Sequence, residues 1–236
     1  MSLPLRDFYA RISNRYDCIN SLMTLGMDRY WRRRAAEKAA TLLSSGLKSP
    51  RCLDACCGSG KLSEQLRLYL QDDADIFGVD FSSSMLAIAV SKTLADDFLV
   101  MASVEALPFD DHSFDLLAMA FASRNLQEAK GGLKRVLGEY RRILKPGGIF
   151  LSIETSQPSS KALAKLYHQL VRVILAPLGG LVSGHRAAYL YLAQSMSTFY
   201  SPEKFSTILS NEGFGDVSYE PLLFGSLAIH WGRCVK

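Results

Sequence analysis

No apolar run in this 236-residue sequence is long enough to cross a bilayer. The longest extends from Leu170 to Val182 and contains Arg172 and Pro177, whereas a membrane-spanning helix needs about 20 predominantly apolar residues. The chain also reaches a charged residue by Arg6 without a long apolar stretch before it, so we expect no secretory signal peptide. These features predict a cytoplasmic protein, and they leave contact with the inner face of a membrane open.

Cysteine pairs with the spacing of a metal site or a disulfide framework are lacking too. The five cysteines stand at positions 18, 52, 56, 57 and 234, an odd number with no C-x-x-C pair, so we expect reduced thiols and no metal. No internal repeat is present. Apolar residues make up 48% of the chain and charged residues 21%, which suits an ordinary globular protein, and we expect residues 1–236 to form a single domain.

Charge of one sign is in only small excess. The net charge is +4, which gives no reason to expect a nucleic-acid partner. The excess lies in residues 1–50, which hold nine Lys and Arg against four Asp and Glu. We expect residues 1–48 to be a helical N-terminal region, whose basic side chains could meet anionic lipid headgroups or form a solvated helix face.

Apolar strands and helical segments alternate from residue 51 onward. Strands are expected at residues 51–55, 76–80, 98–103, 114–121, 149–154, 217–220 and 222–233, and helices at 61–70, 134–144, 160–176 and 187–198. This alternation indicates an open α/β sheet of mostly parallel strands with helices on both faces. Ligands of such sheets bind beyond the carboxyl ends of the strands.

A glycine-containing turn follows the first expected strand. Asp54 lies near the end of that strand, Gly58-Ser59-Gly60 form the turn, and Asp80 ends the second strand. A dinucleotide site would need a further glycine three residues after Gly60, where Ser63 stands. S-adenosylmethionine has no pyrophosphate and does not need that glycine, so the pattern favours this cofactor over NAD.

Within this interpretation each candidate residue has a role toward the cofactor. Asp54 orients the amino-acid end of the cofactor, and the turn Gly58-Ser59-Gly60 lines the methionine and ribose. Asp80 accepts hydrogen bonds from the ribose hydroxyls. The residues after the third strand border the adenine, and the end of the fourth strand lies under the methionine. Each could instead be an ordinary turn, cap or loop residue. The candidates are Asp54, Gly58, Ser59, Gly60, Asp80, Phe81, Ser103, Val104 and Ala120.

Several further segments are more specific than the glycine turn. The stretch Arg11–Arg33 contains Tyr16, Asp17, Asn20, Leu22 and Met23, followed by Gly26, Arg29 and Trp31, and further matching segments are Glu105–Asp115, Phe121–Asn125, Arg142–Gly148 and Tyr189–Met196. Together they resemble the ubiquinone/menaquinone biosynthesis C-methyltransferase family over nearly the whole chain. The resemblance implies a Rossmann-like class I methyltransferase fold with a seven-stranded sheet and a substrate-side helical insertion at residues 158–200.

The resemblance also implies a reaction, namely methyl transfer from S-adenosylmethionine to a ring carbon of a polyprenyl quinol in respiratory quinone biosynthesis. The acceptor would be demethylmenaquinol or a methoxy-polyprenyl-benzoquinol. Arg124 would hold the phenolate with its donor fork, assisted by water shared with Asn125 or Tyr16. A strand-end salt bridge for Arg124 and a core position for Tyr16 remain alternatives. Residues 166–182 and 189–196 would line a channel for the prenyl tail.

Other functions remain open from sequence alone. The acceptor could be a sterol, a phospholipid or a small molecule, or the chain could be a non-catalytic cofactor-binding subunit of a quinone-synthesis assembly. Among partners we expect the polyprenyl quinol, with peripheral membrane contact and a homodimer left open, and no nucleic acid.

Overall fold

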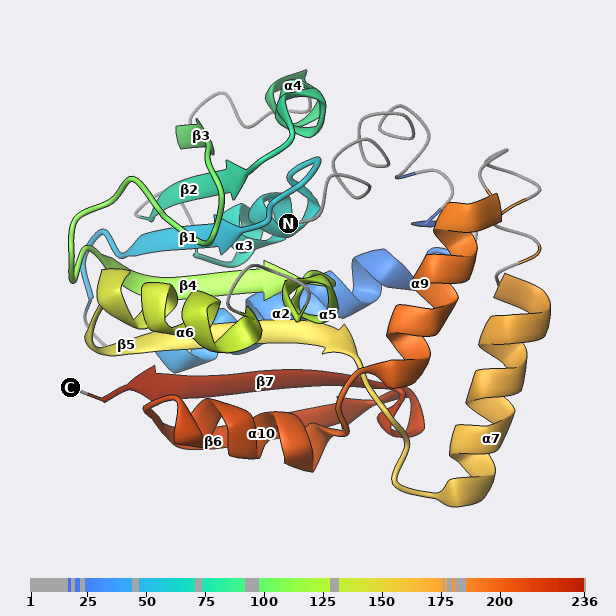
Figure 1. Ribbon diagram of the computed structural model, residues 1–236. Coiled ribbons are helices and arrows are strands. Elements are labelled where there is room, and N and C mark those ends of the chain that lie inside the picture. The colour runs from blue at the N-terminus through green and yellow to red at the C-terminus, as the bar shows by residue number, and fades with distance from the viewer. Residues whose placement is uncertain are drawn as a thin grey trace.

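The computed structural model describes residues 17, 20–21, 24–43, 47–70, 74–91, 98–127, 132–175, 177, 180 and 186–235. Seven strands form one sheet in the order β3-β2-β1-β4-β5-β7-β6 (Figure 1). Strands β1 to β5 pair in parallel, whereas β7 runs antiparallel to both β5 and β6. The prediction of a mostly parallel seven-stranded sheet is therefore confirmed. The strands are β1 Arg51–Ala55, β2 Asp75–Asp80, β3 Phe98–Met101, β4 Phe114–Ala120, β5 Leu144–Thr155, β6 Phe214–Leu222 and β7 Leu227–Cys234.

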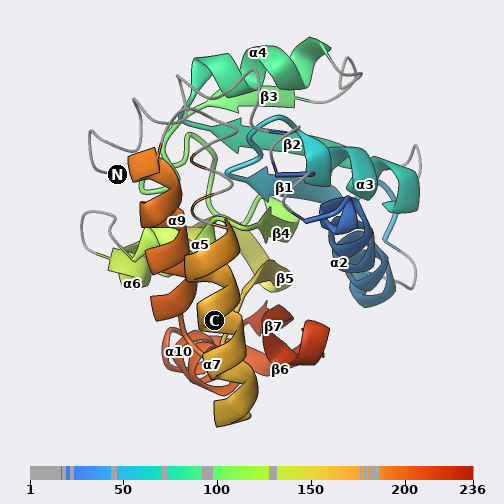
Figure 2. The ribbon, with the colours of Figure 1, turned by 90° about the vertical axis from the view of Figure 1, so that its right-hand side faces the viewer.

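Helices cover both faces of the sheet. In Figure 2, α2 (Met27–Leu43) and α3 (Lys61–Leu70) lie on one side, and α6 (Gly132–Ile143) and α10 (Pro202–Asn211) lie on the other. Helix α4 (Ser83–Ser91) packs against β2 and β3. Each face has its own apolar core, because the sheet separates the two sets of buried side chains.

The sequence pattern explains why the central elements form. From Phe114 to Met119 every residue of β4 is buried, as expected for a parallel strand covered on both faces. Helix α6 buries Leu133, Val136, Leu137 and Tyr140, which recur at the i, i+3, i+4 and i+7 spacing of a single helix face.

Three expected boundaries were wrong. The last strand, β7, begins at Leu227 and not at residue 222, because β6 extends to Leu222 and Leu223–Gly225 form a 3-10 turn between the two strands. Strand β5 begins at Leu144, directly after α6, and not at residue 149, because Pro146-Gly147-Gly148 forms an irregularity within the strand and does not precede it. The helix expected at 160–176 is α7 (Lys161–Leu170) followed by a π-helical turn, η1 (Val171–Leu175). Nothing in the residue pattern distinguishes these two hydrogen-bond spacings.

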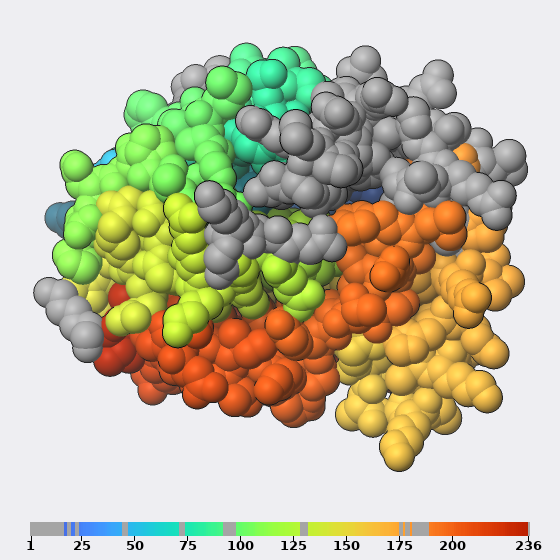
Figure 3. Space-filling model, in the orientation of Figure 1, coloured from blue at the N-terminus to red at the C-terminus, as the bar shows by residue number. Residues whose placement is uncertain are grey.

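A third group of helices stands at the carboxyl ends of the parallel strands. It comprises α5 (Ser123–Leu126), α7, η1 and α9 (Arg186–Thr198). Figures 1 and 2 place α7 and α9 in front of this edge of the sheet, and Figure 3 shows α7 standing out from the body of the molecule beside α9. Among the helices of the described residues, none is long and apolar enough to cross a membrane.

Candidate active site

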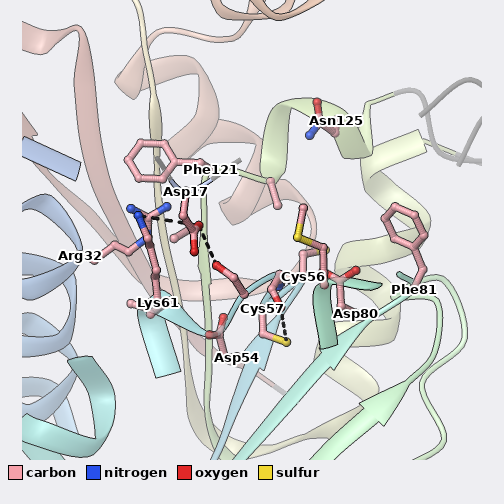
Figure 4. A pocket seen from close by; sticks show the side chains of 16 residues that line it. Asp17, Arg32, Asp54, Cys56, Cys57, Lys61, Asp80, Phe81, Phe121 and Asn125 are labelled. Carbon is pink, nitrogen blue, oxygen red and sulfur yellow. Dashed lines mark hydrogen bonds and ion pairs between the residues drawn. The ribbon is translucent and has the colours of Figure 1, made fainter. Parts of the chain in front are cut away.

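Two adjoining pockets open at the carboxyl ends of β1, β2 and β4, which is where the strand order reverses direction in the sheet. Cys56, Asp80, Phe81 and Asn125 line both of them. The first pocket, shown in Figure 4, extends toward α2, and the second extends toward the end of β3. The lining of the first pocket is formed by Asp17, Arg32, Asp54, Cys56, Cys57, Gly58, Ser59, Lys61, Leu62, Asp80, Phe81, Met85, Ala120, Phe121, Ala122 and Asn125.

The turn after β1 shapes the floor of the first pocket. Gly58 and Gly60 have φ values of +56° and +78°, a left-handed conformation that glycine adopts without steric penalty. Cys56 has φ of +59° in the same turn, which is strained for a residue with a side chain. The Cys57 N–H donates to the Val79 carbonyl at 2.9 Å, so the turn is fastened to the end of β2. Gly60 itself lies outside the pocket lining.

Asp54 is a buried carboxylate, and only one of its two oxygens accepts a hydrogen bond from the described residues. Its Oδ2 accepts hydrogen bonds from the Ser63 N–H at 2.9 Å and the Ser63 hydroxyl at 2.7 Å. Its Oδ1 has no partner among the described residues. Burial raises the pKa of Asp54 to about 7, opposed by the Ser63 hydrogen bonds and by the positive charge of Arg32. A desolvated acid with an unused oxygen in a pocket fits a cationic ligand group.

Asp80 occupies the junction of the two pockets. Its Oδ2 accepts from the Gly58 N–H and its Oδ1 from the Ser82 N–H, both at 2.9 Å. Burial raises the pKa of this carboxyl, and these backbone hydrogen bonds oppose the rise. Each carboxylate oxygen can accept a second hydrogen bond. The side chain is thus fixed in place and still able to receive a pair of ligand hydroxyls.

Two cations close the α2 end of the first pocket. Arg32 Nη1 lies 2.9 Å from Asp28 Oδ2, and Lys61 Nζ lies 3.0 Å from the same oxygen. The Arg32 guanidinium also stacks over the Phe121 ring, 4.9 Å from its centroid. Asp28 is buried, so it holds both cations in fixed positions, where their other N–H groups can donate to a ligand carboxylate.

Ser59 connects the turn to the N-terminal region. Its hydroxyl donates to Asp17 Oδ1 at 2.8 Å, and Lys61 Nζ lies 3.7 Å from the same oxygen. Figure 4 shows the Asp17 side chain beside that of Lys61. A segment some forty residues earlier in the chain therefore completes the wall of the pocket.

The second pocket lies beyond β3. The Ala102 N–H donates to the Asp80 carbonyl at 3.1 Å, which keeps the two strand ends together. Ser103, Val104, Glu105 and Leu126 contribute to its lining. Its wall is more apolar than that of the first pocket, as a site for a flat heterocycle would be.

Helix α5 separates the pockets from the substrate-side helices. Asn125 lines both pockets, whereas Arg124 lines neither. Arg124 Nη1 lies 2.6 Å from Glu154 Oε1, and the two side chains are 5% and 1% exposed. The salt bridge that the sequence left as an alternative for Arg124 is therefore present. Tyr16 lies outside the described residues.

Tyr167 of α7 is a group that sequence reasoning missed. Its hydroxyl is buried and has no hydrogen-bond partner among the described residues. Burial raises the pKa of Tyr167, and the charges of Arg124 and Glu154 act on it in opposite directions. The tyrosine therefore lies within electrostatic reach of the ion pair behind α5.

The predicted cofactor residues come together with one exception. Gly60 serves the turn alone, and the remaining predicted positions that line the pockets are Asp54, Gly58, Ser59, Asp80, Phe81, Ser103, Val104, Ala120 and Asn125. A model of the ubiE/COQ5 methyltransferase family matches residues 3–234 of the chain. The chain belongs to this family. The predicted resemblance is thereby confirmed, and so are methyl transfer as the type of reaction and S-adenosylmethionine as the cofactor.

Curated relatives and solved structures agree with this assignment. The chain is 38% identical to a demethylmenaquinone methyltransferase of Thermus thermophilus, over 95% of this chain and 98% of that protein. It is 34% identical to a ubiquinone/menaquinone biosynthesis C-methyltransferase of Geobacter sulfurreducens, over 97% of this chain and 88% of that one. A SAM-dependent methyltransferase of Thermotoga maritima superposes with a TM-score of 0.61 at 18% identity, covering 97% of this chain and 98% of that chain, a likeness that shows the fold alone.

The site fits the cofactor on its own geometry. The unpartnered Asp54 oxygen suits an ammonium group, the Arg32–Lys61 end suits a carboxylate, and Asp80 suits a pair of hydroxyls. Arg32 and Lys61 were missed from sequence. Lys61 directly follows the turn, and this adjacency was the one available signal, whereas nothing in the pattern linked Arg32 to the pocket.

Proposed function

We propose that the protein transfers the methyl group of S-adenosylmethionine to a ring carbon of a polyprenyl quinol in respiratory quinone biosynthesis. The acceptor is demethylmenaquinol, a methoxy-polyprenyl-benzoquinol, or both. The match to relatives named for demethylmenaquinone and ubiquinone/menaquinone methylation, over nearly the full length of the chain, supports this most strongly. The pocket at the sheet edge independently supports S-adenosylmethionine as the methyl donor, because Asp54 offers an unpartnered carboxylate oxygen and Arg32 and Lys61 offer N–H donors.

The cofactor is proposed to lie along the two pockets. Asp54 receives the α-ammonium group, and Arg32 with Lys61 receives the carboxylate. Asp80 accepts hydrogen bonds from the ribose hydroxyls, and the adenine lies in the second pocket. The turn residues Gly58 and Ser59 line the methionine and ribose, Phe81, Ser103 and Val104 border the adenine, and Ala120 lies beneath the methionine.

Bound S-adenosylmethionine supplies an electrophilic methyl group on a sulfonium. The residues around it must then align the acceptor carbon with that methyl group and stabilise charge on the adjacent phenol oxygen. Asn125 is the member of α5 that faces the pockets, and we assign it the contact with the acceptor oxygen.

Arg124 acts from behind α5. Its guanidinium is almost fully buried and is held by Glu154, so its charge is fixed and poorly screened. Because arginine does not give up its proton, we propose that the charge of Arg124 stabilises the phenolate, and that a water shared with Asn125 or Tyr16 passes the phenol proton on to solvent.

An acceptor with a prenyl tail is dissolved in the bilayer. We therefore propose that the protein works as a peripheral protein at the cytoplasmic face of the membrane. The expected tail channel is not built from the whole of α7, because Leu166 and Leu170 are 57% and 45% exposed and face outward.

The test is a methyl-transfer assay with radiolabelled S-adenosylmethionine and two reduced acceptors, a demethylmenaquinol and a methoxy-polyprenyl-benzoquinol. Transfer to either supports the proposal and identifies the pathway. The Asp80→Ala variant serves as a control for transfer that depends on the described cofactor site. Cofactor binding by the wild-type protein without transfer to either quinol would refute the proposed acceptor class.

A further inference from the structure

Helix α7 and the π-helical turn η1 carry an exposed apolar stripe. Leu163, Leu166, Leu170 and Ile174 are 40%, 57%, 45% and 46% exposed. Spacings of three and four residues place successive members on the same side of a helix. Scattered exposed leucines are ordinary on protein surfaces, but a continuous stripe of large apolar side chains along one helix marks an interaction surface.

The surroundings of this stripe are basic. Lys161 and Lys165 are exposed on α7, and Arg172 is exposed on η1. No acidic residue occurs in the chain between Glu154 and Glu203. At 100° per residue, the three cations lie about 160° around the helix axis from the stripe, so the outward surface has apolar side chains along one edge and basic side chains along the other. Such a surface, free of acids, attracts anionic lipid headgroups and acyl chains, because long basic side chains can reach the headgroups while the leucines enter the bilayer.

Contacts on an adjacent side of α7, about 100° around the helix axis from the stripe, attach the helix to the protein. Val171 is buried against Ala193 of α9, and Tyr167 and Met196 pack beside them. His168 Nε2 lies 2.6 Å from Gln157 Oε1, and Gln157 Nε2 donates to the Met196 carbonyl at 2.8 Å. The helix is therefore attached to α9 by its inner side, and its leucines point away from the protein.

We propose that this stripe, together with Lys161, Lys165 and Arg172, is the surface by which the protein adsorbs to an anionic membrane. The inference rests on the proposed function in one respect, because a bilayer-dissolved acceptor gives the surface its purpose. A second copy of the chain fits less well. A symmetric contact brings the same patch of both copies together, and this patch has three cations along one edge and no acid to pair with them.

The position of the stripe suits delivery of a membrane-dissolved acceptor. Helix α9 contacts both η1 and α5, and α5 carries Asn125 at the pocket. Figure 2 shows α7 and α9 together in front of the carboxyl ends of the strands. Adsorption through α7 would hold this edge of the sheet, and with it the pockets, against the bilayer.

Vesicle sedimentation with the full-length protein tests the proposal. Vesicles of phosphatidylglycerol and phosphatidylcholine are compared with pure phosphatidylcholine. Leu166→Gln with Leu170→Gln should lower partitioning into anionic vesicles by on the order of a hundredfold, since each leucine contributes roughly tenfold when buried. The matched control is Leu68→Gln with Val90→Gln, two apolar residues that are 63% and 61% exposed on α3 and α4, and it should leave partitioning unchanged.

Charge is tested separately. Lys161→Gln, Lys165→Gln and Arg172→Gln together should weaken binding to anionic vesicles by on the order of a hundredfold, at about fivefold for each basic residue near the surface. Lys134→Gln, Arg135→Gln and Lys204→Gln remove the same charge from exposed positions on α6 and α10. An equal loss in both triple variants would overturn the proposal, because binding would then follow net charge alone.

Two further measurements separate this surface from the proposed function. Methyl transfer to a short-tailed, water-soluble quinol should be the same in the stripe variants as in the wild type, which shows that the variants are folded. Transfer by the wild type without binding to anionic vesicles overturns the docking surface and leaves the proposed function standing. Vesicle binding that requires the stripe, without any transfer, supports the surface while the proposed acceptor fails. If the wild type is a dimer that does not bind vesicles, and the variant with Leu166→Gln and Leu170→Gln is a monomer, the stripe is a contact between two copies of the chain. That outcome overturns the proposal.

Discussion

Replacing Asp54 by asparagine should stabilise the ligand-free protein at neutral pH. Burial raises the pKa of Asp54 from 3.8 to about 7, so between these values the folded carboxyl holds a proton that the unfolded chain has lost. Stability contributed by this proton is fully present below pH 4 and is lost as the pH rises to 7. Three pH units at 1.36 kcal/mol each correspond to about 4 kcal/mol. Asp54→Asn removes this loss of stability. The free energy of unfolding of the variant should equal that of the wild type at pH 4 and exceed it by up to about 4 kcal/mol at pH 8.

The same substitution should weaken cofactor binding and abolish its pH dependence. The α-ammonium group pairs with the charged form of Asp54, so below a pKa of about 7 binding requires loss of a proton. The dissociation constant of the wild type should therefore rise about tenfold for each pH unit below 7 and be constant above it. Asp54→Asn should show no such slope. At pH 8 it should bind roughly 10- to 100-fold more weakly, as expected for loss of a hydrogen bond to a charged group.

Two assays follow these effects. Urea unfolding at pH 4.5, 6, 7 and 8 gives the difference in the free energy of unfolding between variant and wild type. Calorimetric titration with S-adenosylhomocysteine, which keeps the ammonium group and cannot react, gives the dissociation constants. Asp110→Asn replaces an exposed aspartate and is the matched control. A stability difference that does not change with pH, or a variant that keeps the wild-type slope in affinity, would refute the reasoning.

Three other substitutions test the acceptor side. Glu154→Gln leaves the buried Arg124 without its counter-ion, and should lower the free energy of unfolding by about 3 kcal/mol in urea titrations. Asn125→Ala should lower kcat by on the order of a hundredfold while cofactor affinity changes less than tenfold, and an equal loss of both would contradict its assignment to the acceptor. Tyr167→Phe removes a buried hydroxyl that has no partner among the described residues, so we expect no loss of stability beyond about 0.5 kcal/mol in the same urea titrations. Tyr140→Phe, which also removes a buried unpartnered hydroxyl, should behave in the same way.

The cofactor-binding residues could be predicted from the sequence, because the same rule places the end of every parallel strand. Parallel strands present their carboxyl ends at one edge of the sheet, so acids at the ends of strands one and two had to be neighbours. Asp54 and Asp80 are, and Ser103 follows β3 beside them. The glycine turn was equally readable, since Gly58 and Gly60 take up backbone conformations that other residues rarely adopt.

Side-chain contacts between residues that are far apart in the sequence could not be predicted in this way. Arg32 reaches the pocket because Asp28 and Phe121 hold it there, and no spacing in the sequence relates α2 to the turn after β4. Phe121 also has a φ of +58°, a strained conformation that tertiary contacts impose. The orientation of Arg124 depends on Glu154, thirty residues later in the chain. Side-chain direction on a helix of four residues is set by such contacts and not by the local pattern.

Helix α5 is the point at which the two sides of the site meet. Successive residues of a helix point about 100° apart, and α5 uses this to place Asn125 toward the pockets while Arg124 turns toward Glu154 and the side of Tyr167. The cofactor pocket can therefore be complete without the arginine, and the arginine can be fixed without the cofactor. An acceptor that approaches from α7 and α9 would reach the charge of Arg124 and the amide of Asn125 at the same place, next to the end of β4. On this arrangement, substitutions at Asn125 and at Glu154 should combine less than additively in kcat, because both groups act on the same acceptor oxygen and the first substitution already removes part of what the second would remove.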